Sequence, residues 1–294
     1  MIKKIRHIVH RILVDYFPKA AISREWKIKY GKPLNWNNPQ SLNEKIQWLM
    51  IHDDMDKWAR CADKYQVRDY IKERGYGDIL TKLYGVWEKP EDIDYDQLPD
   101  KFVIKCNHDS GSTYIVDKSK GFNKEELNEN LRKHVSQRFG YSSCELHYTR
   151  IKPLIIAEEY LPLDDGLNSS SQVDYKFWCF NGETKYCFVC YDRHGSHAVY
   201  DLYTNEPWEP HRIAISKAYS KQQFKDIPAP KNLDKMIEIA KNLSKGFPQV
   251  RVDLYNLEGK IYFGELTLTS GNGKMLYFSQ DFLNELGSYV KLDK

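Results

Sequence analysis

The sequence predicts an α+β fold, on three observations. Apolar and aromatic runs occur in pairs joined by short turns, which is typical of antiparallel hairpins. The segments before about residue 98 instead show helical spacing of their apolar residues. An acidic stretch between Pro90 and Pro99 separates these two textures. We therefore expect a mostly helical N-terminal region over residues 1–98 and an α+β domain over residues 99–294.

Helical periodicity and capping signals place the predicted helices. Ser41 and Glu44 form the S-x-x-E capping box, which opens a helix that runs through Met50. The next helix should run from Ala59 to Arg74 and stop at the glycine that follows. The remaining predicted helices span residues 1–17, 123–137 and 233–243.

Runs rich in β-branched and aromatic residues give the strands. Single strands are predicted over residues 102–106, 113–117 and 154–159. YKFWCFN and TKYCFVCY should form a hairpin that turns at Asn181-Gly182, where positive φ is expected. A second pair, QVRVDLY and KIYFGELTL, turns within Asn256 to Gly259. Several antiparallel pairs favour α+β over a doubly wound parallel sheet.

Composition excludes several classes of protein. Hydrophobic residues make up 41% and charged residues 29% of the 294 positions, which excludes disorder and a bundle of membrane spans. The net charge of +3 is too balanced for a nucleic-acid-binding surface. Six dispersed cysteines with no secretory signal predict reduced thiols and a cytoplasmic protein. Cys187 and Cys190 form C-x-x-C inside an apolar strand and are interpreted as core residues.

The first predicted helix is basic and amphipathic. It places Ile8, Ile12 and other apolar residues on one face, with lysines and arginines among the polar positions. Such a helix either docks on its own domain or makes a weak peripheral contact with an anionic membrane. The second alternative would put the protein at the inner face of the membrane.

Two acids stand out in the last predicted hairpin. Strand alternation puts Arg251 and Asp253 on the face opposite the apolar residues of VRVDLY. Asp253 and Glu265 become close neighbours on one face only if the register across the turn is odd. A bulge with Gly259 in the left-handed region would supply that register. The acids then either bind Mg²⁺ through oxygen ligands or form a cross-strand ion pair with Arg251.

A small-residue loop follows the strand FVIKC. Lys105 lies near the end of that strand, and the loop contains Ser110, Gly111 and Ser112. A glycine that admits backbone N–H groups, small hydroxyls and a strand lysine are typical of a phosphate-binding loop, although an ordinary β-turn has the same composition. Farther along, the strand of IIAEEYL ends in Glu158 and Glu159, where an exposed strand end is the simpler interpretation.

Taken in order, these stretches resemble one family. The ordered blocks are PLNWNNPQSLNEKIQWL, DKYQVRDYI with LYGVW, FVIKCNHDSGS, IIAEEYL, DYKFWCFNGE and VRVDLYNLEGKIYFGELTL. Together they resemble the TupA-like branch of the ATP-grasp superfamily, whose members occur with surface-polysaccharide genes. The resemblance implies that residues 99–294 adopt the ATP-grasp fold, in which two α+β subdomains grip ATP.

The resemblance also implies roles for individual residues. Lys64 and Lys105 match the two nucleotide-binding lysines, and Ser110, Gly111 and Ser112 match the loop over the phosphates. Glu158, Glu159, Tyr160 and Leu161 resemble the adenine-binding hinge, and Lys176 matches a further nucleotide-facing strand residue. Asp253 and Glu265 match the acids that hold Mg²⁺, and Arg251 matches the basic residue near the γ-phosphate. The family's final E-x-N is Glu265-Leu266-Thr267 here, so that Thr267 replaces the amide with a hydroxyl.

The implied activity is that of an ATP-dependent carboxylate–amine ligase that works through an acylphosphate. Its small or glycan-linked acid and amine substrates would belong to a cell-surface polysaccharide or its precursor, joined by an amide to an amino acid or amino sugar. The alternative is a glycosyltransferase, for which Asp94-Tyr95-Asp96 offers a D-x-D motif. That motif lies in the acidic stretch and not at the end of an apolar strand, which favours a solvated turn.

Overall fold

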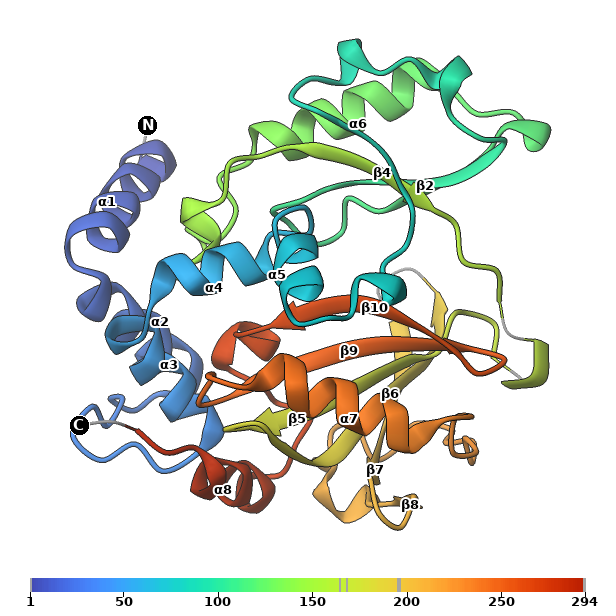
Figure 1. Ribbon diagram of the computed structural model, residues 1–294. Coiled ribbons are helices and arrows are strands. Elements are labelled where there is room, and N and C mark those ends of the chain that lie inside the picture. The colour runs from blue at the N-terminus through green and yellow to red at the C-terminus, as the bar shows by residue number, and fades with distance from the viewer. Residues whose placement is uncertain (1, 164, 168, 195–196, 293–294) are drawn as a thin grey trace. The chain divides into compact units, whose positions relative to one another are not determined.

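The computed structural model describes residues 2–163, 165–167, 169–194 and 197–292, with the side chains of residues 2–7 and 165 outside the description (Figure 1). The predicted first helix therefore has some of its basic side chains outside the described residues. The chain divides into two compact units. The larger unit comprises Met1–Asp54, Ser143–Leu146 and Leu163–Lys294, and the smaller unit comprises Met55–Ser142 and His147–Pro162.

The smaller unit is a four-stranded antiparallel sheet with helices. Its strands are β1 (Leu83–Trp87), β2 (Lys101–Cys106), β3 (Tyr114–Asp117) and β4 (Ile155–Glu159), in the spatial order β1-β4-β2-β3. Helix α6 (Lys124–Ser136) packs on β2, and the core between them includes Phe102, Ile104 and Leu131. Because the inward-facing residues of β2 alternate with exposed ones, a single face of this sheet meets the helix.

The prediction of a single helix from Ala59 to Arg74 is wrong. The structure has α4 (Met55–Ala62) and α5 (Val67–Glu73), with a turn between them. Asp63 causes the break, because its side-chain Oδ1 accepts hydrogen bonds from the backbone N–H groups of Tyr65 and Gln66. This local bonding competes with helix continuation. The turn also directs the backbone N–H of Lys64 to the carbonyl of Asn107, at 3.0 Å.

The larger unit contains a six-stranded antiparallel sheet in the order β10-β9-β5-β6-β7-β8. Its strands are β5 (Asp174–Phe180), β6 (Glu183–His194), β7 (His197–Thr204), β8 (Glu209–Pro210), β9 (Val250–Leu257) and β10 (Lys260–Thr267). Helix α7 (Leu233–Ser244) packs on β5, β6 and β9 (Figure 1). Helices α1 (Ile2–Tyr16), α2 (Pro18–Tyr30), α3 (Leu42–His52) and α8 (Gln280–Tyr289) complete the unit.

Local sequence signals explain several of these elements. The predicted capping box is confirmed, because Ser41 accepts from the backbone of Glu44 and the Glu44 carboxylate accepts from the backbone of Ser41. The predicted hairpin turn is also confirmed, with φ of 51° at Asn181 and 84° at Gly182. Two consecutive positive φ values match the right-handed twist of the strands, which explains why Asn-Gly is found there.

The α+β class is confirmed, whereas the compact units do not follow the boundary expected at residue 98. Strand β1 lies before that boundary and pairs with β4 after it. The division into a helical region over residues 1–98 and an ATP-grasp domain over residues 99–294 stays a prediction. All six cysteines are buried free thiols, including Cys187 and Cys190 in β6. Among the described residues, no helix combines the length and apolarity that crossing a bilayer requires.

Burial of His147 in the smaller unit leads to a prediction on pH. The imidazole is fully buried between Trp58 and Tyr148, and neither ring nitrogen has a hydrogen-bond partner among the residues that the structure describes. Burial disfavours the charged form and lowers the pKa of His147 from 6.5 to about 3. Between these values the unfolded chain binds a proton that the folded chain does not, so stability falls as the pH drops below about 6.5.

We expect this histidine to cost about 2 kcal/mol of unfolding free energy between pH 7 and pH 5. His147→Phe keeps an aromatic ring at the position and removes the titration. Urea unfolding of both proteins at the two pH values measures the difference. An equally steep loss of stability in the variant would contradict the assignment.

Candidate functional site

One face of the larger unit's sheet carries a row of charged side chains. Along β9, Val250, Val252 and Leu254 are fully buried on the face covered by α7. Arg251 and Asp253 alternate with them and therefore lie on the opposite face. Strand pairing places Glu265 of β10 and Lys176 of β5 beside Asp253, one on each side. Three neighbouring strands thus contribute Glu265, Asp253 and Lys176 to one row.

A bulge at Gly264 makes this row possible. Phe263 pairs with Leu254, and the next paired residue of β10 is Glu265, opposite Asp253. We expected a bulge at Gly259 to shift the register of the two strands. The shift is present, but the expected position of the bulge is wrong. Gly259 does have a positive φ of 97°, but it belongs to the turn, whereas Gly264 is the extra residue. A Cβ at Gly264 would lie 3.0 Å from the carbonyl oxygen of Asp253, so a larger side chain would crowd the bulge.

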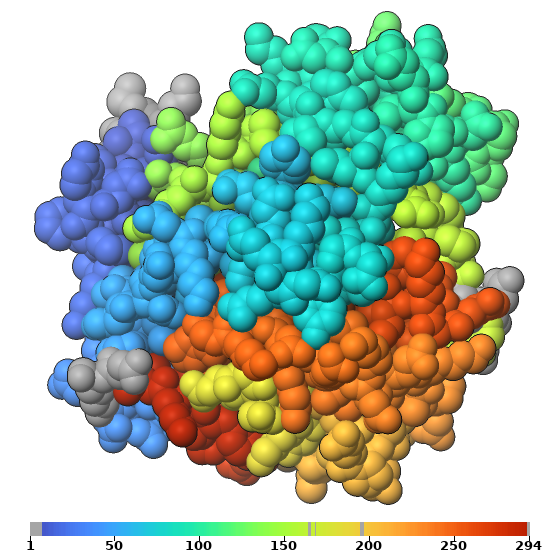
Figure 2. Space-filling view, in the orientation of Figure 1, coloured from blue at the N-terminus to red at the C-terminus, as the bar shows by residue number. Residues whose placement is uncertain are grey.

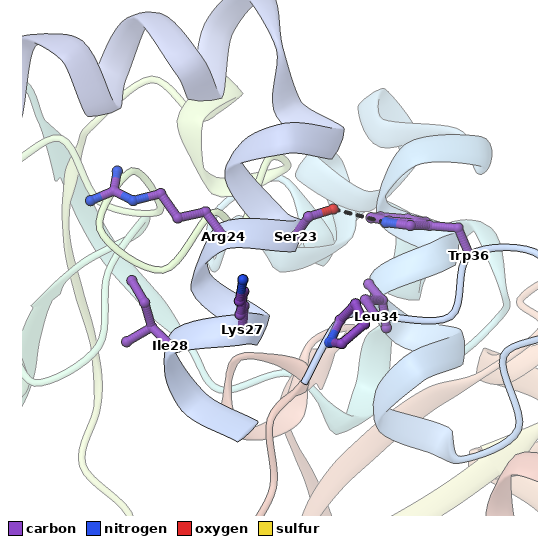
Figure 3. A pocket seen from close by; sticks show the side chains of 7 residues that line it. Ser23, Arg24, Lys27, Ile28, Leu34 and Trp36 are labelled. Atoms are coloured by element: carbon purple, nitrogen blue, oxygen red, sulfur yellow. Dashed lines mark hydrogen bonds between the residues drawn. The ribbon is translucent and has the colours of Figure 1, made fainter. Parts of the chain in front are cut away.

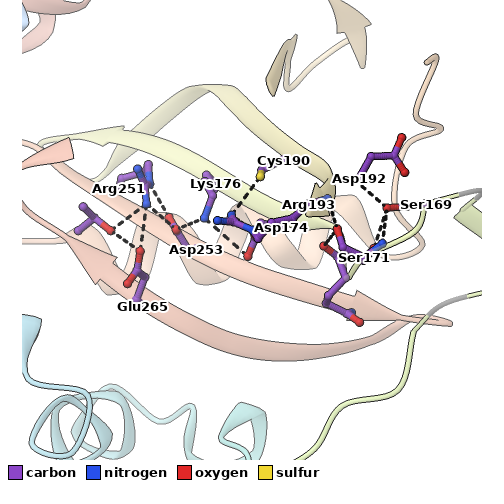
Figure 4. A network of polar contacts seen from close by, with 12 residues as sticks. Ser169, Ser171, Asp174, Lys176, Cys190, Asp192, Arg193, Arg251, Asp253 and Glu265 are labelled. Atoms are coloured by element: carbon purple, nitrogen blue, oxygen red, sulfur yellow. Dashed lines mark hydrogen bonds and ion pairs between the residues drawn. The ribbon is translucent and has the colours of Figure 1, made fainter. Parts of the chain in front are cut away.

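Arg251 is the centre of the contacts on this face (Figure 4). Its Nε and Nη2 donate to the two carboxylate oxygens of Asp253 at 2.7 and 2.6 Å. Nη2 also lies 3.1 Å from Oε1 of Glu265 and 3.0 Å from Oγ1 of Thr267. Three oxygens from two strands therefore converge on one guanidinium nitrogen. The cross-strand ion pair, which the sequence left as an alternative to metal binding, is present.

Lys176 extends the network from the other side. Its Nζ lies 2.5 Å from Oδ2 of Asp253 and 3.6 Å from Oδ1 of Asp174. Arg193 in turn contacts Oδ2 of Asp174 at 3.0 Å (Figure 4). Cations and acids alternate along this line, so each buried charge has an opposite charge beside it, which buried ion pairs require.

The protonation states follow from burial and these partners. Burial raises the pKa of Asp253, and the charges of Arg251 and Lys176 oppose that effect. Burial by itself would lower the pKa of Lys176, but Asp174 and Asp253 outweigh it and raise the pKa. Burial likewise opposes the charge on Arg251, whose pKa is raised by Asp253 and Glu265. The two cations therefore favour the charged form of the Asp253 carboxylate, against the effect of burial.

This donor set fits Mg²⁺, which prefers oxygen ligands and is commonly held by one or two carboxylates. Asp253 and Glu265 supply carboxylates on the same face, and Thr267 adds a neutral hydroxyl oxygen. Their convergence on one nitrogen shows that the three oxygens can surround a cationic centre together. Their assignment as metal ligands stays a prediction.

The small-residue loop lies in the smaller unit, between β2 and β3. Ser112 is buried: its hydroxyl accepts from the backbone N–H of Cys106 at 2.9 Å and donates to Asp109. Nζ of Lys64 donates to the backbone carbonyl of Asp109. Ser110 and Gly111 are exposed at the tip, where Gly111 has a φ of 94°. The geometry thus divides the predicted set, with Ser112 holding the base of the loop and Ser110 and Gly111 available at its tip.

A thiol, an imidazole and a carboxylate also meet under this loop. The ligand atoms of Cys106, His108 and Asp109 lie within 4.8 Å of one another. However, the two oxygens of Asp109 already accept from Ser112 and contact Nδ1 of His134, the latter at 2.5 Å. We interpret the group as packing that fixes the loop.

Lys105 and the end of β4 meet on the same sheet. Nζ of Lys105 lies 2.6 Å from Oε2 of Glu158, and Arg68 contacts Oε1 of the same carboxylate at 3.4 Å. Glu159 accepts from the backbone N–H of Lys82 at 3.1 Å. Glu158 is thus a buried acid between two cations and not the exposed strand end that was the simpler interpretation. Tyr160 and Leu161 follow β4, and Nζ of Lys101 lies 3.9 Å from the ring centre of Tyr160.

Sequence reasoning missed several residues of these clusters. Arg68 and Glu158 are separated by 90 positions, and His134 and Asp109 by 25, so no local pattern connects them. Asp174 could have been found, because it lies two positions from Lys176 in DYKFW and strand alternation puts both on one face.

The model of the family described as TupA-like ATPgrasp matches residues 44–291. The chain belongs to this family. The expected resemblance and the ATP-grasp fold are therefore confirmed for this TupA-like ATPgrasp protein. No protein of curated function matched its sequence.

Solved structures similar to this TupA-like ATPgrasp chain include three ligases. D-alanine–D-alanine ligase from Bacillus anthracis complexed with ATP is 16% identical, with a TM-score of 0.43 over 78% of this chain and 64% of that chain. The ATP-grasp ligase PsnB complexed with a minimal precursor is 9% identical, with 0.40 over 85% and 68%. Phosphoribosylamine–glycine ligase from Thermotoga maritima is 17% identical, with 0.41 over 71% and 48%. The chain thus spans about half to two thirds of these proteins.

Proposed function

We propose that this protein is an ATP-dependent carboxylate–amine ligase that forms an amide through an acylphosphate. The observation that carries the proposal is the convergence of Asp253, Glu265 and Thr267 oxygens on Nη2 of Arg251. Membership of the TupA-like ATPgrasp family supports ATP as the nucleotide. A triphosphate needs both cations and a metal-binding acid pair, and this sheet face offers them within hydrogen-bond distance of one another.

In the smaller unit, we assign nucleotide binding to Lys64, Lys105, the tip of the loop and the end of β4. Lys105 lies at the end of β2 with its charge held toward Glu158, so its ammonium is fixed in place before a ligand binds. Gly111 has open space where a Cβ would be, which lets backbone N–H groups approach phosphate oxygens. Backbone groups of Glu159 to Leu161 would bind the base.

In the larger unit, Asp253 and Glu265 would hold Mg²⁺, with Thr267 as a neutral neighbour. When bound, Mg²⁺ supplies positive charge against the triphosphate oxygens. Arg251 keeps its charge at any physiological pH and would bind the oxygens of the transferred phosphoryl group. Lys176 would assist as a further cation on the same face.

The reaction would proceed as two successive nucleophilic displacements. A carboxylate oxygen of the acid substrate attacks the γ-phosphorus, the bond to the β–γ bridging oxygen breaks, and ADP leaves with the electron pair. The amine nitrogen next attacks the acyl carbon, phosphate leaves with the C–O electron pair, and the nitrogen loses a proton. Arg251 stabilises the phosphoryl oxygens, whose negative charge would otherwise repel the attacking carboxylate.

The proposal extends to the class of substrate. We propose a cell-surface polysaccharide or its precursor, with the amide linking an amino acid or amino sugar to an acid. Its support is the resemblance to the TupA-like branch, whose genes accompany surface-polysaccharide genes. The glycosyltransferase alternative gains no support from its motif, because Asp94 accepts from the backbone of Asp96 and the side chain of Gln97 within an exposed turn.

Thermal-shift measurements test the proposal. A ligand that binds only the folded protein at 100 times its Kd adds about 2.7 kcal/mol of stability. We expect Mg-ATP to raise the melting temperature and pools of acids and amines to release ADP and phosphate. Lys105→Met should weaken ATP binding by about tenfold, whereas Lys133→Met, an exposed lysine of α6, should not. Stabilisation by a UDP-sugar with no response to ATP would contradict the ligase and favour a transferase.

A further inference from the structure

Helix α1 presents its apolar side to the outside. Ile8 is 57% exposed and Tyr16 75%, and Val9 and Ile12 are also exposed. With about 100° of rotation per residue, these four positions share a strip about 100° wide. Val14 lies on the other side of the helix and is only 3% exposed. The helix therefore docks through the side opposite its apolar strip, which the described part of the chain leaves uncovered.

Two further large apolar side chains are exposed in this part of the chain. Phe17 follows the helix and is exposed, as is Ile28 of α2, a helix that packs against α1. Figure 2 shows α1, in dark blue, at the surface of the molecule. The four side chains of the strip, with Phe17 directly after them in the chain, form the kind of exposed apolar surface that marks an interaction site.

The charge of the chain is concentrated in the same segment. Residues 1–32 contain nine lysines and arginines against two acids, a net charge of +7, whereas the whole chain carries +3. The remaining residues therefore carry −4. This segment also precedes residue 44, where the match to the family begins. An apolar strip within a cationic segment is complementary to a surface that is both apolar and anionic.

A cavity beside α2 has the same mixed character (Figure 3). Its volume is about 610 Å³, and its walls include the apolar side chains of Ile28, Leu34 and Trp36 together with the cationic side chains of Arg24 and Lys27. Lys27 is exposed, so its charge is accessible to an anionic group next to an apolar wall.

We propose that α1 and α2 form a membrane-binding face that attaches the protein to a bilayer containing anionic phospholipids. Ile8, Val9, Ile12 and Tyr16 insert among the headgroups and upper acyl chains, while the exposed lysines of α2 contact lipid phosphates. This attachment is independent of ATP and of the proposed ligase chemistry.

Vesicle co-sedimentation with the full chain tests the proposal. We expect binding to vesicles of phosphatidylcholine with about 30% phosphatidylglycerol and at least tenfold weaker binding to phosphatidylcholine alone, since each basic residue contributes about fivefold. Ile8→Asp with Ile12→Asp should reduce binding by more than about tenfold. Ile115→Asp with Ile213→Asp, an equal change at two exposed isoleucines elsewhere, should not.

A pair of lysine substitutions separates the electrostatic contribution to vesicle binding from the apolar contribution. Lys27→Glu with Lys29→Glu should lower binding to the anionic vesicles by more than about tenfold, whereas Lys217→Glu with Lys221→Glu, also exposed, should leave it unchanged within about twofold. Circular dichroism and melting curves verify that each variant is folded.

Three results would overturn the proposal. The first is equal binding to both kinds of vesicle or to neither. The second is equal loss of binding in the α1 variant and its control. The third is a wild-type dimer in light scattering that the α1 variant converts to a monomer, without vesicle binding, because a second copy of the chain would then cover the strip.

Discussion

Asp253→Asn should lower ligase turnover by about 10³-fold and the free energy of unfolding by about 3–5 kcal/mol. The carboxylate is only 2% exposed and contacts both Arg251 and Lys176. An amide has nearly the same shape but no charge, so two buried cations would lose their main counter-ion, and the proposed Mg²⁺ site would lose one of its carboxylates. ADP release measures turnover, and urea unfolding measures stability.

The matched control is Asp201→Asn. Asp201 is equally buried and pairs with Arg212 at 2.8 Å, but it lies in β7, outside the charged row. We expect a comparable loss of stability with turnover retained in the fraction that remains folded. If Asp253→Asn turned over at the wild-type rate, the metal assignment on this face would be wrong.

Glu265→Gln should separate the chemistry from the fold. The Glu265 side chain is 43% exposed, so its removal from the ion pair with Arg251 should change stability by less than about 1 kcal/mol. Turnover should nevertheless fall by about 10²–10³-fold, because a neutral amide replaces a proposed metal ligand. Turnover is measured as ADP release, with melting curves to confirm the fold.

Glu183→Gln is the control for this substitution. Glu183 is an exposed glutamate on the same sheet that pairs with Lys241 at 2.8 Å. Its substitution should leave turnover unchanged, and equal effects of both variants would argue against a specific role for Glu265. Mass spectrometry of surface glycan from cells with the wild-type or the Glu265→Gln protein then tests the substrate class. An unchanged glycan alongside lost turnover in vitro would reject the polysaccharide while keeping the ligase.

Features set by neighbouring residues were predictable from the sequence. Asn181-Gly182 and the Ser41 capping box correspond to specific backbone geometries, and both have the expected form. The helix break at Asp63 was not predicted, because the surrounding apolar spacing is helical and the competing side-chain bonds depend on the exact turn. Strand β1 was also missed: its five residues are all partly exposed and show no alternation.

The candidate site shows the same division. Arg251, Asp253 and Glu265 come from two adjacent strands, so alternation and one register argument bring them together. The place of the bulge was not predictable, since Gly259 and Gly264 both suit one and only packing against Asp253 and Tyr255 distinguishes them. Arg68 reaches Glu158 from a distant helix, and no short-range pattern encodes such a contact.

The bulge at Gly264 has a consequence for how this hairpin can change. The bulge lies between the turn and Glu265. It therefore determines, for every later residue of β10, which residue of β9 it pairs with and which face of the sheet its side chain lies on. Adding or removing one residue pair on the turn side would lengthen or shorten the hairpin and still leave Glu265 opposite Asp253. A regular ladder that kept Gly264 would pair Gly264 with Asp253 and Glu265 with Val252, which would rotate Glu265 and Thr267 to the face packed on α7. The facing of the two acids therefore tolerates changes of length at the tip of the hairpin, but it depends on Gly264 staying outside the regular pairing.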